Sequence, residues 1–157
     1  MRFLLATFAV FLTSPAAAFD YFSNETKLIG DLIKCPSARI SSDPGLPDLW
    51  SCILPGAEVV KVFVNSDESG GVANVKFMWN DWTRDTGYGI HTDEDIARAW
   101  LSAISTHYAP KQVEEVLEAF SSSSDITIVS EHYILTYTYY KGPAIDERLF
   151  IITKSDD

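Results

Sequence analysis

The stretch VVKVFVNSDESGGVANVKFMWN, residues 59–80, decides the fold because it is the most regular β signal in the first half of the chain. Apolar and polar residues alternate on both sides of the polar turn DESGG, residues 67–71, whose glycines can adopt positive φ. One side of the first strand carries Val60, Val62 and Val64, and one side of the second carries Ala73, Val75, Phe77 and Trp79. The pattern predicts two antiparallel strands with one buried face.

Before the hairpin, the sequence predicts one helix and one irregular segment. Leu28, Ile29, Leu32 and Ile33 recur at helical spacing within residues 25–34, and Cys35 with Pro36 ends the helix. Residues 37–56 are rich in proline and glycine, which indicates turns. A short extra strand near residues 38–41 stays an open alternative.

After the hairpin, the sequence predicts a long loop at residues 81–91 and then two helices. Thr92 is expected to cap the first helix, with Asp95 as the acidic partner of a capping box. Pro110 is expected in the first turn of the second helix. The buried stripes of these helices are predicted to be Ile96, Ala97, Trp100, Leu101 and Ile104, followed by Val113, Val116, Leu117 and Phe120.

Three strands are expected at the C-terminal end, around residues 126–129, 133–139 and 149–152. The strands and helices do not alternate one by one, which favours an α+β fold. We predict a single domain at residues 19–157 with an antiparallel sheet of about five strands and a helical pair on one face. The expected order is α, disulfide loop, β-β, α-α, β-β-β.

Residues 1–18 have the three parts of a cleavable signal peptide. Arg2 supplies a positive charge, FLLATFAVFL (residues 3–12) is apolar, and TSPAAA (residues 13–18) ends with small residues before Phe19. The apolar run is half of the about 20 residues that a membrane-spanning helix needs. We therefore expect export rather than anchoring, with no transmembrane segment after cleavage. The bacterial periplasm is favoured and secretion to the medium is the alternative.

Cys35 and Cys52 are the two cysteines of the chain. Outside the cytoplasm disulfides form readily, and two cysteines allow one intramolecular pairing. The sequence predicts a disulfide that closes the irregular segment.

The chain is acidic, with 22 Asp and Glu residues against 12 Lys and Arg residues and a formal net charge of −10. Loss of Arg2 with the signal peptide would make the charge about −11. Such a surface repels phosphate backbones, so we predict no nucleic-acid partner. The sequence leaves the oligomeric state open.

The segment of residues 79–91 is the strongest candidate for a binding site, because it gathers aromatic and charged residues in an expected loop. Its members are Trp79, Asp81, Trp82, Arg84, Asp85, Tyr88 and His91. The alternative interpretation is a loop whose tryptophans pack under the sheet. A second aromatic group is formed by Tyr133, Tyr137 and Tyr139 on one side of a strand, where packing under the helices is favoured over partner contact.

No motif in the sequence identifies a reaction, a cofactor or a metal site. There is no GxSxG elbow and no complete phosphate loop, and Asp81, Asp85 and His91 match no established metal-binding spacing. We predict a small exported binding or accessory protein without catalytic activity, which contacts a protein or a glycan. One alternative is an exported hydrolase that uses Asp81, Asp85 and His91. Another is a purely structural protein of the cell envelope.

Overall fold

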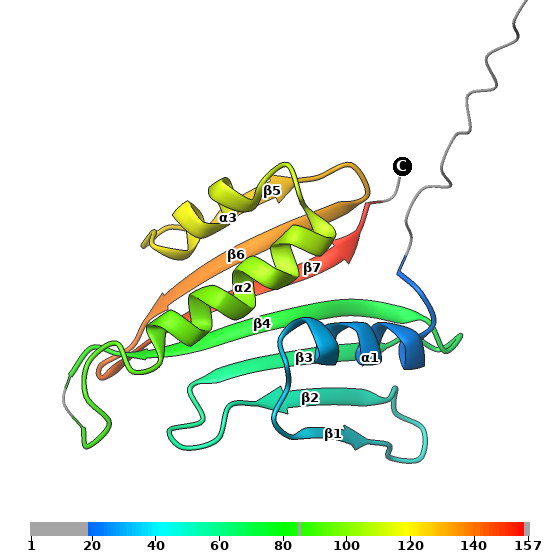
Figure 1. Ribbon diagram of the computed structural model, residues 1–157, viewed down its shortest axis with the longest axis horizontal. Coiled ribbons are helices and arrows are strands. Elements are labelled where there is room, and N and C mark those ends of the chain that lie inside the picture. Colours follow the sequence, from blue (N-terminus) through cyan, green and yellow to red (C-terminus); the bar gives the residue numbers. More distant parts are fainter. Residues whose placement is uncertain (1–18, 85, 156–157) are drawn as a thin grey trace, which may run out of the picture.

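The computed structural model describes residues 19–84 and 86–155. The predicted signal peptide and Asp85 lie outside these residues. Ten elements follow along the chain (Figure 1). They are α1 (Phe22–Leu32), β1 (Ala38–Ser41), β2 (Leu49–Ile53), β3 (Val60–Ser66), β4 (Val72–Trp82), α2 (Glu94–Tyr108), α3 (Val113–Phe120), β5 (Ile126–Val129), β6 (Tyr133–Lys141) and β7 (Ile145–Lys154).

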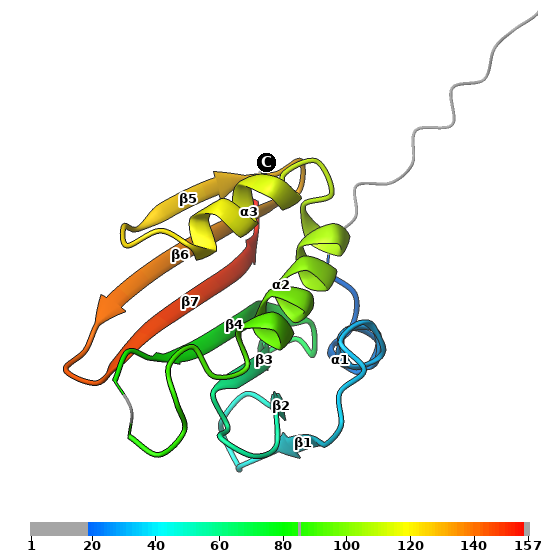
Figure 2. The ribbon, with the colours of Figure 1, turned by 60° about the vertical axis from the view of Figure 1, so that its left-hand side comes forward.

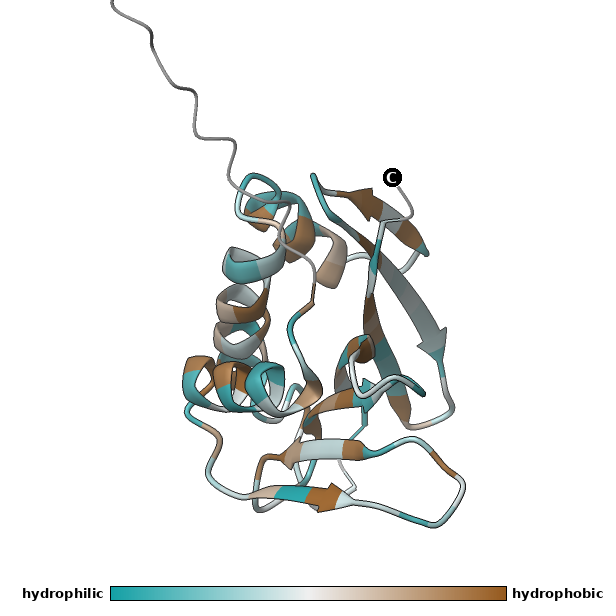
Figure 3. Cartoon of the chain, turned by 90° about the vertical axis from the view of Figure 1, so that its right-hand side faces the viewer, coloured by the Kyte–Doolittle hydropathy of each residue, from teal (hydrophilic) through white to brown (hydrophobic). Residues whose placement is uncertain are grey.

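The strands form one seven-stranded sheet in the order β1-β2-β3-β4-β7-β6-β5. All neighbouring strands are antiparallel. The sheet is therefore two meanders that join where β4 pairs with β7, and α2 and α3 connect one meander to the other. The three helices lie on the same face of the sheet (Figures 2 and 3). The predicted α+β class with an antiparallel sheet is confirmed.

The expected hairpin forms as β3 and β4. Val62 pairs with Phe77 and Val64 with Val75, so these apolar residues share the face under the helices. Ala73 was expected on the same side but is exposed, because the register shifts at Asn65 and Ser66 and Val72 is buried instead. In the turn, Asp67 Oδ1 accepts hydrogen bonds from Ser69 N and Gly71 N, both at 2.8 Å. Hydrogen bonds from Ser69, first from its hydroxyl, lower the pKa of the Asp67 carboxyl.

The sheet has seven strands instead of about five, because β1 forms at residues 38–41, where a short strand is an open alternative, and β2 arises from the part of the segment read as irregular. The disulfide joins Cys35, just after α1, to Cys52 on β2, with 6.0 Å between the Cα atoms. Trp50 on β2 is 4% exposed and lies under α1, where a Cβ on Gly30 would come within 3.5 Å of its ring. The predicted disulfide is thus present, and α1 joins the helical pair on the covered face.

The starts of both later helices also differ from the prediction. Asp93 occupies the cap position of α2 with φ 58°, and no side chain caps the helix. Thr92 Oγ1 instead lies within hydrogen-bonding distance of Tyr88 O and Gly89 O. The hydroxyl therefore stabilises the preceding loop and does not cap α2. Helix α3 begins at Val113, after Pro110. Its cap position is Gln112, and Gln112 N donates to Ala109 O in a preceding turn.

The core fills the space between the helices and the sheet. Trp79, Phe77 and Phe120 pack together there, with the rings of Trp79 and Phe120 stacked at 5.2 Å and those of Phe77 and Phe120 at 6.1 Å. Tyr133 and Tyr137 are also buried, which confirms that this side of β6 packs under the helices. None of the helices described is long and apolar enough to cross a membrane.

Candidate functional site

The candidate segment begins on a strand and continues as a loop. Trp79, Asp81 and Trp82 belong to β4, which extends two residues beyond the expected end at Asn80. Arg84, Tyr88 and His91 belong to the connection of residues 83–93, called the 83–93 loop below, and Arg84 is exposed. Asp85 lies outside the described residues.

Backbone and side-chain hydrogen bonds hold the 83–93 loop against the sheet. Its first residue, Thr83, donates from N to Ala144 O in the β6–β7 turn at 3.1 Å. Near its other end, His91 N donates to Trp82 O at 3.1 Å. Trp79 Nε1 donates to Thr92 O at 3.0 Å. Contacts at both ends restrict the conformations open to the loop.

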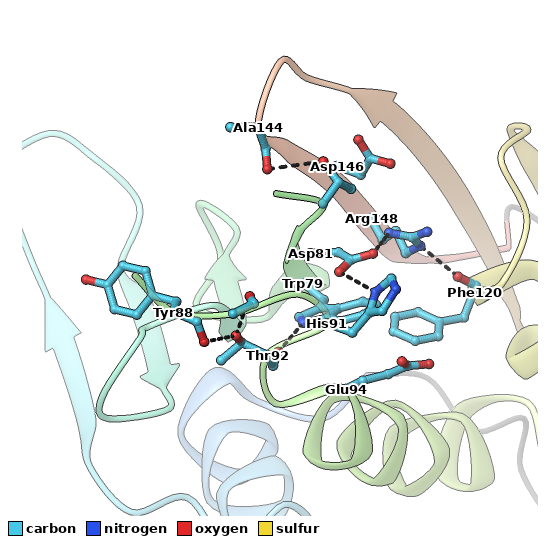
Figure 4. Close-up of polar contacts among 12 residues, drawn as sticks. Trp79, Asp81, Tyr88, His91, Thr92, Glu94, Phe120, Ala144, Asp146 and Arg148 are labelled. Carbon is cyan, nitrogen blue, oxygen red and sulfur yellow. Dashed lines mark hydrogen bonds and ion pairs between the residues drawn. The ribbon is translucent and has the colours of Figure 1, made fainter. Parts of the chain in front are cut away.

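Asp81 brings the loop and a distant strand together. Its side chain is 1% exposed, and His91 Nδ1 lies 2.9 Å from Oδ1 while Arg148 Nη1 donates to Oδ2 at 2.8 Å (Figure 4). His91 has φ 55°, a backbone conformation that few non-glycine residues adopt. The structure thus brings two of the predicted site residues, Asp81 and His91, into contact.

Arg148, which sequence reasoning missed, is the center of the polar cluster. It pairs with Trp79 across β4 and β7, and its guanidinium lies over the rings of Trp79 at 5.3 Å and Tyr139 at 5.2 Å. Its Nε also donates to Phe120 O at the end of α3, at 3.0 Å. One cation therefore links the sheet, the 83–93 loop through Asp81, and helix α3.

A second buried carboxylate lies directly beside the first. Asp146 on β7 pairs in register with Asp81 on β4, is 6% exposed, and accepts a hydrogen bond at Oδ2 from the hydroxyl of Tyr139. This hydrogen bond, more than burial, raises the pKa of Tyr139, so the hydroxyl stays protonated. Among the described residues, Asp146 Oδ1 and Trp82 Nε1 are buried without a hydrogen-bond partner.

The outer surface of the loop is aromatic and apolar. Trp82 is half-buried and stacks on Tyr88, with 5.4 Å between the ring centroids and 26° between the planes. Tyr88 is 54% exposed and Ile90 is 56% exposed. Figure 4 shows Tyr88 pointing away from the Asp81 cluster, so the buried polar cluster and the exposed aromatic surface are separate parts of one segment.

The polar cluster contains one element of a catalytic site, the contact between Asp81 and His91. Asp81 orients His91 through Nδ1 and leaves Nε2 for another group, as in an Asp–His pair of a general base. However, Arg148 already neutralises Asp81, and the third residue of the hydrolase hypothesis, Asp85, is outside the described part. Within residues 19–84 and 86–155, no three His, Cys, Asp or Glu side chains are placed to hold a metal ion.

Comparison with known proteins gives no relative: no family model, curated protein or solved structure matches the chain.

Proposed function

We propose that the protein is a small exported binding or accessory protein, without catalytic activity, that contacts its partner through the 83–93 loop. The Trp82–Tyr88 stack carries this proposal, since Tyr88 is more than half exposed and is held by the half-buried ring of Trp82 at the end of β4, and such an aromatic side chain offers contact area at low entropic cost. Export to the periplasm remains part of the proposal, and the disulfide between Cys35 and Cys52 is consistent with it.

The surface around the stack favours a protein partner over a glycan. Ile90 lies two residues after Tyr88 and exposes more than half of its surface. Aliphatic side chains beside aromatic ones are typical of protein interfaces, in which a few large anchors supply most of the binding free energy.

The test is capture of a partner from the envelope fraction of the source cells. We expect Trp82→Ala/Tyr88→Ala to lose the partner that the unchanged protein retains, with the same circular-dichroism spectrum. Tyr140→Ala is the matched control, because Tyr140 is 69% exposed on β6 and takes no part in the stack. Equal capture by the double variant and the control would contradict the proposal that the 83–93 loop binds the partner.

The exported hydrolase stays the second candidate, favoured by the 2.9 Å contact between Asp81 and His91. It predicts turnover of an ester, phosphoester or glycoside substrate that His91→Ala abolishes. The binding proposal predicts no turnover of any of these substrates by the unchanged protein. A chromogenic substrate panel, measured for both proteins, separates the two functions.

A further inference from the structure

Glu25, near the start of α1, is a buried carboxylate far from the 83–93 loop. It is 4% exposed. Its Oε1 accepts a hydrogen bond from the hydroxyl of Tyr108 at the end of α2, and its Oε2 accepts one from Asp20 N at 3.0 Å. A carboxylate in this position is hydrogen-bonded, but hydrogen bonds alone do not neutralise its charge.

The surroundings of Glu25 are short of positive charge. Among the described residues, its ion-pair partner is His107, whose Nε2 lies 4.0 Å from Oε1 and whose ring carries charge only when protonated. Burial, followed by the charge of Glu25, raises the pKa of Tyr133 to about 12 and that of Tyr108 further. Both phenols therefore remain neutral, and a cation beside Glu25 would stabilise the buried charge.

Phe19 brings the predicted mature N-terminus to this carboxylate. Its ring packs 4.9 Å from the ring of Tyr133 and 5.6 Å from that of Tyr108. The next residue, Asp20, donates its backbone N–H to Glu25. Covalent geometry keeps the nitrogen of Phe19 within about 7 Å of Glu25 Oε2, because one residue separates it from the donating nitrogen.

We propose that Glu25 is the binding site for the α-ammonium group that processing between Ala18 and Phe19 creates. A signal peptidase would add water across this peptide bond, leaving a carboxylate on Ala18 and an amine on Phe19. The amine takes up a proton at neutral pH. The mature N-terminus then forms a buried ion pair with Glu25, so that processing completes the folded domain. This inference rests on the proposed export, but not on the binding role of the loop.

The first test compares two N-termini in otherwise identical proteins. One chain begins at Phe19 and the other keeps Ala16, Ala17 and Ala18, which moves the charge away from Glu25. We expect the unfolding equilibrium constant, from urea denaturation, to be at least about tenfold smaller for the chain that begins at Phe19, because a rise of one unit in the pKa of the amine corresponds to a tenfold change. In a Glu25→Gln background this ratio should approach one. Glu131→Gln is the control and should leave the ratio unchanged, because the Glu131 side chain is 67% exposed.

The second test needs no substitution, so it can be carried out even if the Glu25→Gln protein does not fold. NMR titration of the Phe19 amine should give a pKa at least about one unit above the usual 7.7–8.0. The titratable groups that face the amine are Glu25, His107, Tyr108 and Tyr133, with Asp20 next to it in the chain. An ordinary pKa for the amine, or equal stability of the two chains, would overturn the proposal.

Mass spectrometry of the exported protein gives the third readout, and Phe19 should be its first residue. Another first residue would also overturn the proposal. None of these proteins changes the 83–93 loop, so failure here leaves the partner-capture test intact, and failure of partner capture leaves Glu25 as the N-terminal site.

Discussion

Arg148 and Asp81 form the ion pair on which the polar cluster depends, with exposed side-chain fractions of 12% and 1%. Removal of the cation leaves the buried carboxylate of Asp81 with the side chain of His91 as its remaining polar contact. We expect Arg148→Met to lower the free energy of unfolding by about 3–5 kcal/mol, the usual cost of breaking a buried pair. Urea denaturation measures this change.

A surface pair provides the control for that experiment. Lys27 and Asp31 are 3.5 Å apart on α1, but their side chains are 81% and 75% exposed, and solvent screens such pairs. Lys27→Met should leave the free energy of unfolding unchanged within error. If Arg148→Met behaved in the same way, the ion pair would have no role in holding the 83–93 loop.

At this scale the sequence singled out Asp81 and His91 but not Arg148. Asp81 and His91 were recognisable because they lie ten residues apart in a segment rich in aromatic and charged residues. Arg148 is 67 residues from Asp81 and meets it through the register of β4 and β7, which alternation of polar and apolar residues does not specify. The charged run Asp146–Glu147–Arg148 also hid the start of β7, although an arginine inside a strand was a usable signal.

Strand β6 places tyrosines under the helices, which makes stability sensitive to alkaline pH. Burial, first among the causes, raises the pKa of Tyr133 and of Tyr137 from 10 to about 12. In the unfolded chain these phenols ionise near pH 10, while in the folded chain they retain their protons. The stability they contribute is complete below pH 10 and is lost as the pH rises toward about 12.

Urea midpoints should therefore change little between pH 9 and 10 and fall between pH 10 and 11, and Tyr137→Phe should reduce the slope of the midpoint against pH. Phenylalanine removes the titrating group but keeps the ring that packs 4.7 Å from Phe150. A slope that is the same in Tyr137→Phe would show that burial of this hydroxyl does not govern the alkaline response.

The disulfide acts on the edge of the sheet formed by β1 and β2. It closes a loop with a sequence separation of 17, for which the chain-entropy model gives roughly 3 kcal/mol of stabilisation. Replacement of Cys35 and Cys52 by serine should lower the free energy of unfolding by about this amount. Amide exchange should increase first in β1 and β2, and uniform exchange across the sheet would argue against a local role.

Elements with clear periodicity were predictable from sequence, whereas β2 in the turn-rich segment was not expected and the strand at residues 38–41 was only an open alternative. The β3–β4 hairpin, the helical pair and β6 follow long apolar patterns, while β5 has only four residues, Ile126–Val129. In contrast, β1 has four residues that are all exposed and therefore carries no burial pattern. Thr92 was a plausible cap, but hydrogen bonds to the 83–93 loop compete for its hydroxyl.

Across the whole molecule, the two proposed sites lie at opposite ends of β4. The 83–93 loop follows the Trp82 end, and the start of α1 lies near the Val72 end, where Phe22 N donates to Gly70 O at 3.1 Å (Figure 1). The face of the sheet that the helices cover, with the buried polar cluster, lies between the two proposed sites. This arrangement lets the N-terminus contribute to stability while the loop remains available to a partner.

Site-specific photocrosslinking in the source cells tests the binding role of the loop most directly. A photoreactive phenylalanine analogue at position 88 should give a discrete adduct with one partner protein. The same analogue at position 129 is the control, because Val129 is 63% exposed on the edge strand β5. An adduct at position 88 that is absent at position 129 is the predicted result. No adduct at position 88, or the same adducts at both positions, would contradict a binding surface on the 83–93 loop.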